Sequence, residues 1–193
     1  FIFGLGNPGS KYSRTRHNVG FETIDSLARQ FAPGQPATCK FDALCIETMV
    51  GEEKVLFLKP QTFMNKSGIS VKQAISFYKA NPETDILVIV DDIHLACGQL
   101  RMRTAGSGGG HNGLNNIVDH IGGEQWTRLR IGIDAPEKIE QADYVLGKFT
   151  EVQWMVVEKS LAKAVCATEL WIREGAENAM NNCNETNTQE KIK

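Results

Sequence analysis

The chain has 193 residues, of which 41% are hydrophobic and 23% are charged, and its formal net charge is -2. These values are typical of a folded globular protein, and the length suits one domain better than two. No apolar stretch reaches the roughly 20 residues of a membrane-spanning helix, so we expect none. We expect a single domain over residues 1–180 and a polar, disordered tail over residues 181–193.

The first 31 residues predict a strand, a turn and a helix. Residues 1–5 are apolar and predict a buried strand. Gly6-Asn7-Pro8-Gly9 follows as a turn, because proline presets φ and glycine accepts the positive φ of a type II turn. Residues 18–31 have apolar side chains at helical spacing and predict a helix.

A hairpin and a second helix are expected next. Residues 41–50 and 54–59 are strand-like runs separated by Gly51-Glu52-Glu53, which predicts an antiparallel hairpin. Residues 67–79 predict a helix, with Ser67 as a candidate N-cap.

The second half of the chain continues the alternation. The nearly continuous apolar run at residues 85–90 is the best candidate for a central strand covered on both faces, and it ends at Asp91-Asp92. The remaining expected elements are a strand at 99–104, a glycine-rich loop at 105–110, a helix at 112–120, a strand at 127–134 and a helix at 151–179. This order predicts an α/β protein, a single-domain three-layer α/β/α sandwich with a mixed, mostly parallel central sheet.

Charge and cysteine content give weaker indications. Residues 54–82 contain five lysines and no acid, so they could present a basic face to a phosphate backbone, although a solvated lysine face is the simpler interpretation. The five cysteines have no CxxC spacing. We therefore expect reduced thiols in a cytoplasmic protein and no zinc site.

The first motif, Gly4-Leu5-Gly6-Asn7-Pro8-Gly9, fits the GxGxxG fingerprint of dinucleotide-binding proteins. The fit is weak, because Pro8 stands where a helix should begin and offer N–H groups to a pyrophosphate. A nicotinamide-dependent enzyme therefore remains a minor alternative.

The second motif joins a histidine to a distant carboxylate. His17 directly precedes a predicted helix, and Asp91 ends the most buried predicted strand. A carboxylate that binds one imidazole nitrogen fixes the tautomer and leaves the other nitrogen free to accept a proton. Taken alone, His17 could equally be a surface histidine, and Asp91 an acid that begins a turn.

Two further clusters precede helices. Gly108-Gly109-Gly110 leads into His111 and Asn112, where glycines allow a ligand to approach the main chain and a helix N-terminus favours negative charge. Asn65 stands before the helix expected at 67–79, and a helix cap is its simplest role. Each cluster alone is ambiguous.

Together these stretches resemble the bacterial-type peptidyl-tRNA hydrolases, from the N-terminus to about Phe149. The matching segments are GLGNPG (4–9), Tyr12, TRHNVG (15–20), PQTFMNKSG (60–68), VDDIHL (90–95), GGGHNGLNNI (108–117), RLRIGI (128–133) and YVLGKF (144–149). The pairing of TRHNVG with GGHNGL is far more specific than GxGxxG alone.

The resemblance implies an activity and a catalytic pair. The family cleaves the ester between a peptide and the 3′ ribose of tRNA, without metal or cofactor, and recycles tRNA from abortive translation. By motif match, His17 looks like the catalytic base and Asp91 like its orienting carboxylate. The asparagines that hold the peptide main chain, the catalytic water or the oxyanion would be Asn7, Asn65 and Asn112.

The resemblance also implies substrate contacts. Tyr12, Met64 and His111 would shape the pocket, together with Asn65 and Asn112. Arg103 and Arg130 fall where the family has basic residues that grip tRNA phosphates. We expect the acceptor stem and 3′ end of peptidyl-tRNA as the partner, no membrane, and a monomer.

Some positions depart from the family pattern. After Asp91-Asp92 the family usually has an acid and a proline, where this chain has His94 and Ala96. Asn115 replaces a usual basic residue. The alternative function is a non-catalytic RNA-binding relative of the same fold, as in chloroplast splicing factors.

Overall fold

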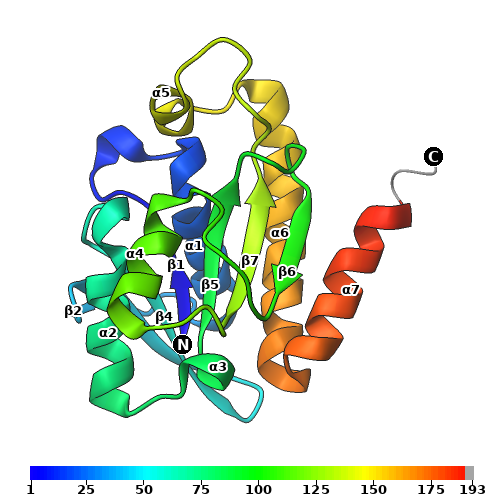
Figure 1. The fold of residues 1–193 in the computed structure, drawn as a ribbon. Coiled ribbons are helices and arrows are strands. Elements are labelled where there is room, and N and C mark those ends of the chain that lie inside the picture. Colours follow the sequence, from blue (N-terminus) through cyan, green and yellow to red (C-terminus); the bar gives the residue numbers. More distant parts are fainter. Residues whose placement is uncertain (190–193) are drawn as a thin grey trace.

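The structure, a computed structural model, describes residues 1–189, with side chains to residue 184. In this part of the chain seven strands form one sheet in the order β2-β3-β4-β1-β5-β7-β6 (Figure 1). The strands are β1 (Ile2–Gly4), β2 (Thr38–Lys40), β3 (Ala43–Val50), β4 (Glu53–Pro60), β5 (Leu87–Asp92), β6 (Leu100–Arg103) and β7 (Thr127–Gly132).

The sheet is mixed, as predicted. The four central strands β4, β1, β5 and β7 run parallel to one another, while β3 and β6 pair antiparallel with the outer two of them and β2 pairs antiparallel with β3. The predicted hairpin is confirmed, since β3 and β4 pair over their full length, from Ala43 opposite Pro60 to Val50 opposite Glu53. Every residue of β5 is buried, which explains its continuous apolar run.

Helices cover both faces of the sheet. The α-helices are α1 (Val19–Phe31), α2 (Ser67–Tyr78), α3 (Pro82–Asp85), α4 (Asn112–Ile121), α5 (Gln141–Leu146), α6 (Glu151–Glu174) and α7 (Ala176–Gln189). Three short 3-10 helices are η1 (Ser10–Tyr12), η2 (Arg16–Asn18) and η3 (Met64–Lys66).

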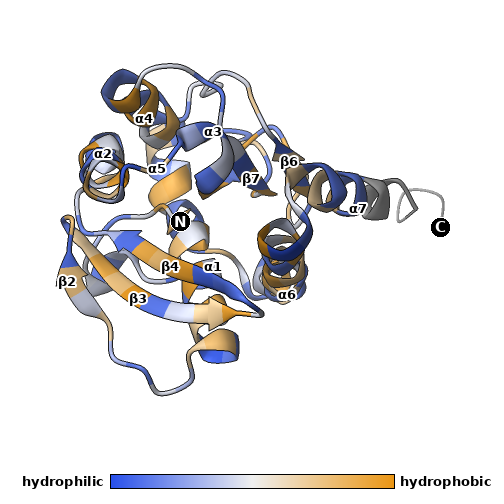
Figure 2. Cartoon of the chain, turned by 90° about the horizontal axis from the view of Figure 1, so that it is seen from below, coloured by the Kyte–Doolittle hydropathy of each residue, from blue (hydrophilic) through white to orange (hydrophobic). Residues whose placement is uncertain are grey.

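Alternating side chains of the strands divide the core into two layers. Ile2 of β1 belongs to the same core cluster as Leu27 of α1 and Leu161 of α6, whereas Phe3 belongs to the cluster of Val71 of α2 and Leu114 of α4. This alternation follows from the two-residue period of a strand. In Figure 2, α2 and α4 lie on one side of the strands and α6 lies on the other. The three-layer sandwich is therefore confirmed.

The C-terminal region differs from the prediction. The helix expected over 151–179 is interrupted at Gly175, whose φ of 87° is outside the helical range, and α7 then continues to Gln189. Cys183 is buried, and the Asn184 side chain forms hydrogen bonds of 3.1 and 3.2 Å with the N–H and C=O of Met102. The predicted disordered tail is thus wrong for residues 181–184, and residues 190–193 lie outside the described residues.

The start of α2 also differs from the prediction. Lys66 occupies the cap position, and Ser67 is the first helical residue, where its hydroxyl donates a 2.9 Å hydrogen bond to the carbonyl of Met64. Ser67 therefore links α2 to η3 by this hydrogen bond, and it is not the N-cap. In the described part of the chain, no helix has the length and apolar character needed to cross a membrane.

Candidate active site

The predicted catalytic pair is formed. Nδ1 of His17 lies 2.9 and 3.0 Å from the two carboxylate oxygens of Asp91, although 74 residues separate them in the chain. His17 belongs to η2 and Asp91 to the end of β5, and both side chains are buried. The pair therefore lies at the carboxyl ends of the parallel strands, the edge where ligands of such sheets commonly bind.

Close packing of two glycines determines where His17 lies. A Cβ on Gly20, in the first turn of α1, would lie 2.5 Å from the carbonyl oxygen of Ile89 and from the main chain of Leu5. A Cβ on Gly4 would in turn lie 2.2 Å from the carbonyl oxygen of Gly20. The main chain of α1 thus rests directly on β1 and β5, and η2 places His17 over the end of β5.

A second imidazole binds the same carboxylate. Nε2 of His111 lies 3.1 Å from Oδ1 of Asp91, and the rings of His17 and His111 are 5.1 Å apart. Nδ1 of His111 accepts a 3.3 Å hydrogen bond from the N–H of Leu114, as the N-cap of α4. Since Nδ1 accepts, a neutral His111 carries its proton on Nε2 and donates it to Asp91. This leaves His111 no nitrogen free to act as a base.

The tautomer of His17 is the opposite one. Its Nδ1–H donates to Asp91, so Nε2 carries a lone pair that is available to accept a proton.

Burial by itself raises the pKa of the Asp91 carboxyl, but the adjacent imidazoles of His17 and His111 outweigh it and hold that pKa well below its usual range. Asp91 is therefore an anion between two histidines.

Asn7 and Asn18 form a buried polar pair beside the histidine. The Asn18 side chain accepts from the N–H of Asn7 at 2.8 Å and donates to its carbonyl at 3.0 Å. The side-chain oxygen of Asn7 accepts a 2.8 Å hydrogen bond from the N–H of Met64. Asn7 is thereby fixed at both ends, and its NH2 group remains as the donor that these bonds do not use.

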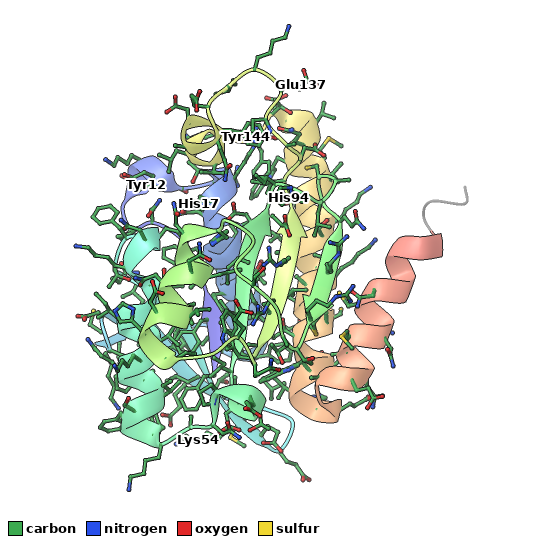
Figure 3. The ribbon with its side chains drawn as sticks, in the orientation of Figure 1. Tyr12, His17, Lys54, His94, Glu137 and Tyr144 are labelled. Carbon is green, nitrogen blue, oxygen red and sulfur yellow. The ribbon has the colours of Figure 1, made fainter. Side chains whose placement is uncertain are left out.

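A cavity of about 260 Å³ opens beside the His17–Asp91 pair. Figure 3 shows His17 and His94 at the upper end of the sheet, below Tyr144. The residues that line the cavity come from η2, β5, the loops beyond it, β7, α4 and α5: His17, Asp91, Asp92, Ile93, His94, Gly109, Gly110, His111, Asn112, Arg130, Gln141, Ala142 and Val145. A cavity of about 520 Å³ lies elsewhere, around Phe1 and Trp171, but no histidine lines it.

The structure brings five of the ten predicted residues into one cavity lining. His17, Asp91, His111, Asn112 and Arg130 line the cavity. Gly113 lies between Met64 and His111, because a Cβ there would be 2.7 Å from Sδ of Met64 and 3.1 Å from Cε1 of His111.

Five predicted residues lie outside this cavity lining: Asn7, Tyr12, Met64, Asn65 and Arg103. Asn7 and Met64 are buried and joined by a 2.8 Å hydrogen bond. Asn65 is exposed on η3, next to Met64, and Tyr12 packs edge-on against Phe63 with ring centroids 6.4 Å apart. Arg103 is exposed on the outer strand β6. Arg103 is therefore not part of the cavity.

Arg130 and the lysines of residues 54–82 have different surroundings. Arg130 donates to Asp92 at 3.1 Å and to the carbonyls of Ser107 and Gly108 at 2.9 and 3.3 Å, so its guanidinium holds the glycine-rich loop. Of the predicted lysine face, Lys54 lies at the opposite end of the molecule from His17 (Figure 3) and pairs with Glu47 at 2.7 Å. Lys59 pairs with Asp25 at 2.5 Å. These two lysines do not extend a basic face to the cavity.

Two functional candidates, Arg16 and Asn18, were not singled out by the sequence analysis. Arg16 is buried, donates to the Tyr144 carbonyl at 3.3 Å and to Gln153 at 2.9 Å, and stacks on the Tyr144 ring at 4.1 Å. It therefore ties η2 to α5, one wall of the cavity. The sequence signal that could have indicated Arg16 and Asn18 is their position on either side of His17 in TRHNVG.

One group of side chains could hold a metal ion. The ligand atoms of His17, Asp91 and His111 all lie within 4.8 Å of one another. Two imidazole nitrogens and a carboxylate oxygen suit a borderline-soft cation such as Zn²⁺.

Comparisons with known proteins identify the family of the chain. A family model described as peptidyl-tRNA hydrolase matches residues 1–191. A peptidyl-tRNA hydrolase of Rhodopirellula baltica is 48% identical over 184 residues, covering 95% of this chain and 96% of the relative. One from Lachnoclostridium phytofermentans is 47% identical, with coverage of 97% and 98%. A crystal structure of peptidyl-tRNA hydrolase from Acinetobacter baumannii superposes with a TM-score of 0.88 at 38% identity, covering 95% of this chain and 93% of that one. The chain belongs to the peptidyl-tRNA hydrolase family.

Proposed function

We propose that the chain hydrolyses the ester bond between a peptide and the 3′ ribose of tRNA, and so recycles tRNA from abortive translation. The observation that carries the proposal is the His17–Asp91 pair, with contacts of 2.9 and 3.0 Å, beside an open cavity. The names of the relatives supply the substrate class, and the His17 tautomer supplies a base.

The reaction needs one water molecule and one proton shuttle. Nε2 of His17 takes a proton from water while the water oxygen attacks the ester carbonyl, and Asp91 stabilises the resulting imidazolium. The tetrahedral intermediate then collapses, Nε2–H returns the proton to the 3′ oxygen of the ribose, and the peptide leaves as an acid. Such base catalysis contributes on the order of 10²–10⁴-fold to the rate.

Amide donors would bind the substrate and the developing charge. The Asn7 NH2 group is held in a fixed direction, because its partner oxygen is engaged by Met64. Asn112 lines the cavity at the start of α4, where the helix dipole favours negative charge. We assign Asn7, Asn65 and Asn112 to the peptide main chain, the catalytic water or the oxyanion, with Tyr12, Met64 and His111 shaping the pocket.

The finer expectations about partners follow from this assignment. The acceptor stem and 3′ end of the tRNA would approach over the glycine-rich loop, with Arg103 and the loop held by Arg130 facing the phosphates. Asn115 is exposed on α4 and contributes no charge there. We further propose a monomer that works in the cytoplasm without metal or cofactor.

The direct test is a peptide-release assay on peptidyl-tRNA with EDTA-treated protein. We expect turnover of the unaltered chain and a loss of turnover in His17→Ala that is far larger than its loss of folding stability. Near-normal release by His17→Ala would overturn the mechanism. Tight tRNA binding without any release by the unaltered chain would favour the alternative, a non-catalytic RNA-binding relative.

A further inference from the structure

We propose that His17, His111 and Asp91 form an inhibitory binding site for a divalent transition metal ion such as Zn²⁺. The inference rests on the proposed function, because the inhibition acts on the base that hydrolysis uses. The ion would replace the hydrogen bonds that both imidazoles make to Asp91.

The donor atoms lie close enough together for one ion to reach all three after the two imidazole rings approach each other. Zinc–ligand bonds of about 2.0–2.2 Å separate tetrahedral donors by roughly 3.3 Å. Oδ1 of Asp91 lies 2.9 Å from Nδ1 of His17 and 3.1 Å from Nε2 of His111, and the three donors span at most 4.8 Å. Binding therefore needs a slight widening at the carboxylate and an approach of the two rings, without a change of fold.

The chemistry of the site also suits zinc. Three protein ligands with one open position are the pattern of solvent-accessible zinc sites, and the cavity beside His17 has room for water as the fourth ligand. Asp91 offers a buried negative charge. The positive charge of Arg130 is paired with Asp92 at 3.1 Å, so it opposes a cation less than a free guanidinium would.

Inhibition follows from the position of one proton. A metal ion on Nδ1 of His17 takes that lone pair, so the proton of the neutral ring stands on Nε2. Nε2 is the atom that must accept the proton of the attacking water, and it then has no lone pair. The ion therefore lowers kcat and leaves KM nearly unchanged.

The second histidine limits the affinity. In the structure, Nδ1 of His111 accepts a 3.3 Å hydrogen bond from the N–H of Leu114. Coordination of a metal ion through Nε2 would place the proton of His111 on Nδ1. The bound state loses this long capping bond, so the site favours ions with a high affinity for imidazole. Mg²⁺ prefers oxygen ligands in octahedral geometry and should not bind here.

The test titrates Zn²⁺ into the EDTA-treated chain during peptide release. We expect kcat to fall at least tenfold, KM to stay within about twofold, EDTA to restore activity and equal Mg²⁺ to have no effect. Co²⁺ added without substrate should give the strong visible absorption of a tetrahedral ion, without a thiolate charge-transfer band. A thiolate band would assign the metal to cysteines and overturn the proposal.

Two variants locate the ion. His111→Asn removes one ligand but keeps a residue favoured at an N-cap, and it should weaken Zn²⁺ and Co²⁺ binding at least tenfold. His94→Ala is the control, because His94 lines the same cavity outside the donor cluster, and it should bind both ions as before. Unweakened binding by His111→Asn, or loss of binding in His94→Ala, would overturn the proposal. If the metal-free chain releases no peptide, the proposed function fails, while the Co²⁺ spectrum still reports on the site.

Discussion

The side-chain oxygen of Asn7 accepts a 2.8 Å hydrogen bond from the main-chain N–H of Met64, across 57 residues of sequence. This bond connects the turn after β1 to η3, the short helix that carries Asn65. It also orients the amide, because an oxygen that accepts from Met64 leaves the NH2 group as the functional end. In the proposed mechanism, the oxygen therefore has a structural role and the nitrogen binds substrate.

Substitution of Asn7 by Asp tests this separation. A carboxylate still accepts from the Met64 N–H but offers no donor to the substrate, so the fold should persist while hydrolysis is lost. Removal of one such donor costs on the order of 10²–10³ in kcat. Peptide release and thermal unfolding of Asn7→Asp check this, and a variant that melts far below the parent would assign Asn7 a mainly structural role.

The Asp91→Asn variant tests the orientation of His17. An amide NH2 facing Nδ1 favours the tautomer with the proton on Nε2, the atom that must act as base. We expect kcat to fall by about 10³–10⁴, with tRNA binding retained. Binding to a non-hydrolysable peptidyl-tRNA analogue serves as the control, and a loss below tenfold in kcat would contradict the role given to Asp91.

Acid should remove the stabilising contribution of Asp91. The pKa of this carboxyl is lowered in the folded chain, so its contribution is complete above the unfolded value of about 3.9 and is lost as pH falls through the folded value. The difference in unfolding free energy between the parent and Asp91→Asn should therefore shrink below about pH 4. Denaturant titrations at several pH values measure it. Glu52→Gln, at an exposed turn, should show no such change.

The order of elements could be predicted because it depends on local pattern. The apolar run of β5, the β3–β4 hairpin and the helices α1 and α4 all carry periodic side chains or turn residues. The packed residues at 181–184 could not be predicted, since Cys183 is buried by contacts from distant parts of the chain and Asn184 binds Met102, 82 residues away. Non-local contacts of this kind leave no signal in a polar stretch.

The candidate site shows the same limit. The motifs identified His17, Asp91 and Asn7. No local pattern indicates that His111 also binds the Asp91 carboxylate, or that the Arg130 guanidinium donates to Asp92. Both facts depend on the pairing of β5 with β7 and on the position of α4. The residue types were therefore predictable, while their partners required the three-dimensional arrangement.

Arg16→Lys tests whether the wall of the cavity depends on the residue before His17. Lysine keeps the charge but cannot make both the Tyr144 and the Gln153 contacts or stack as a planar group. We expect a stability loss of about 1–3 kcal/mol and faster hydrogen exchange in α5. Arg29→Lys, on the exposed end of α1, is the matched control and should change neither. Unchanged exchange in α5 would remove the link between η2 and this wall.

Gly20→Ala tests the close packing that positions His17. Alanine is the better helix former by about 1 kcal/mol, so propensity alone predicts a more stable chain. The added Cβ, however, would lie 2.5 Å from main-chain atoms of Leu5 and Ile89. Main-chain atoms cannot relieve this clash by a change of side-chain rotamer. We expect a net loss of about 1–3 kcal/mol in unfolding free energy. Because α1 must lift away from β5, the His17–Asp91 contact should lengthen and kcat should fall more than tenfold.

Gln30→Ala, at an exposed position of the same helix, controls for propensity and should retain full activity. A Gly20→Ala chain that is both stabilised and fully active would show that the approach of α1 to the sheet does not set the geometry of the catalytic pair.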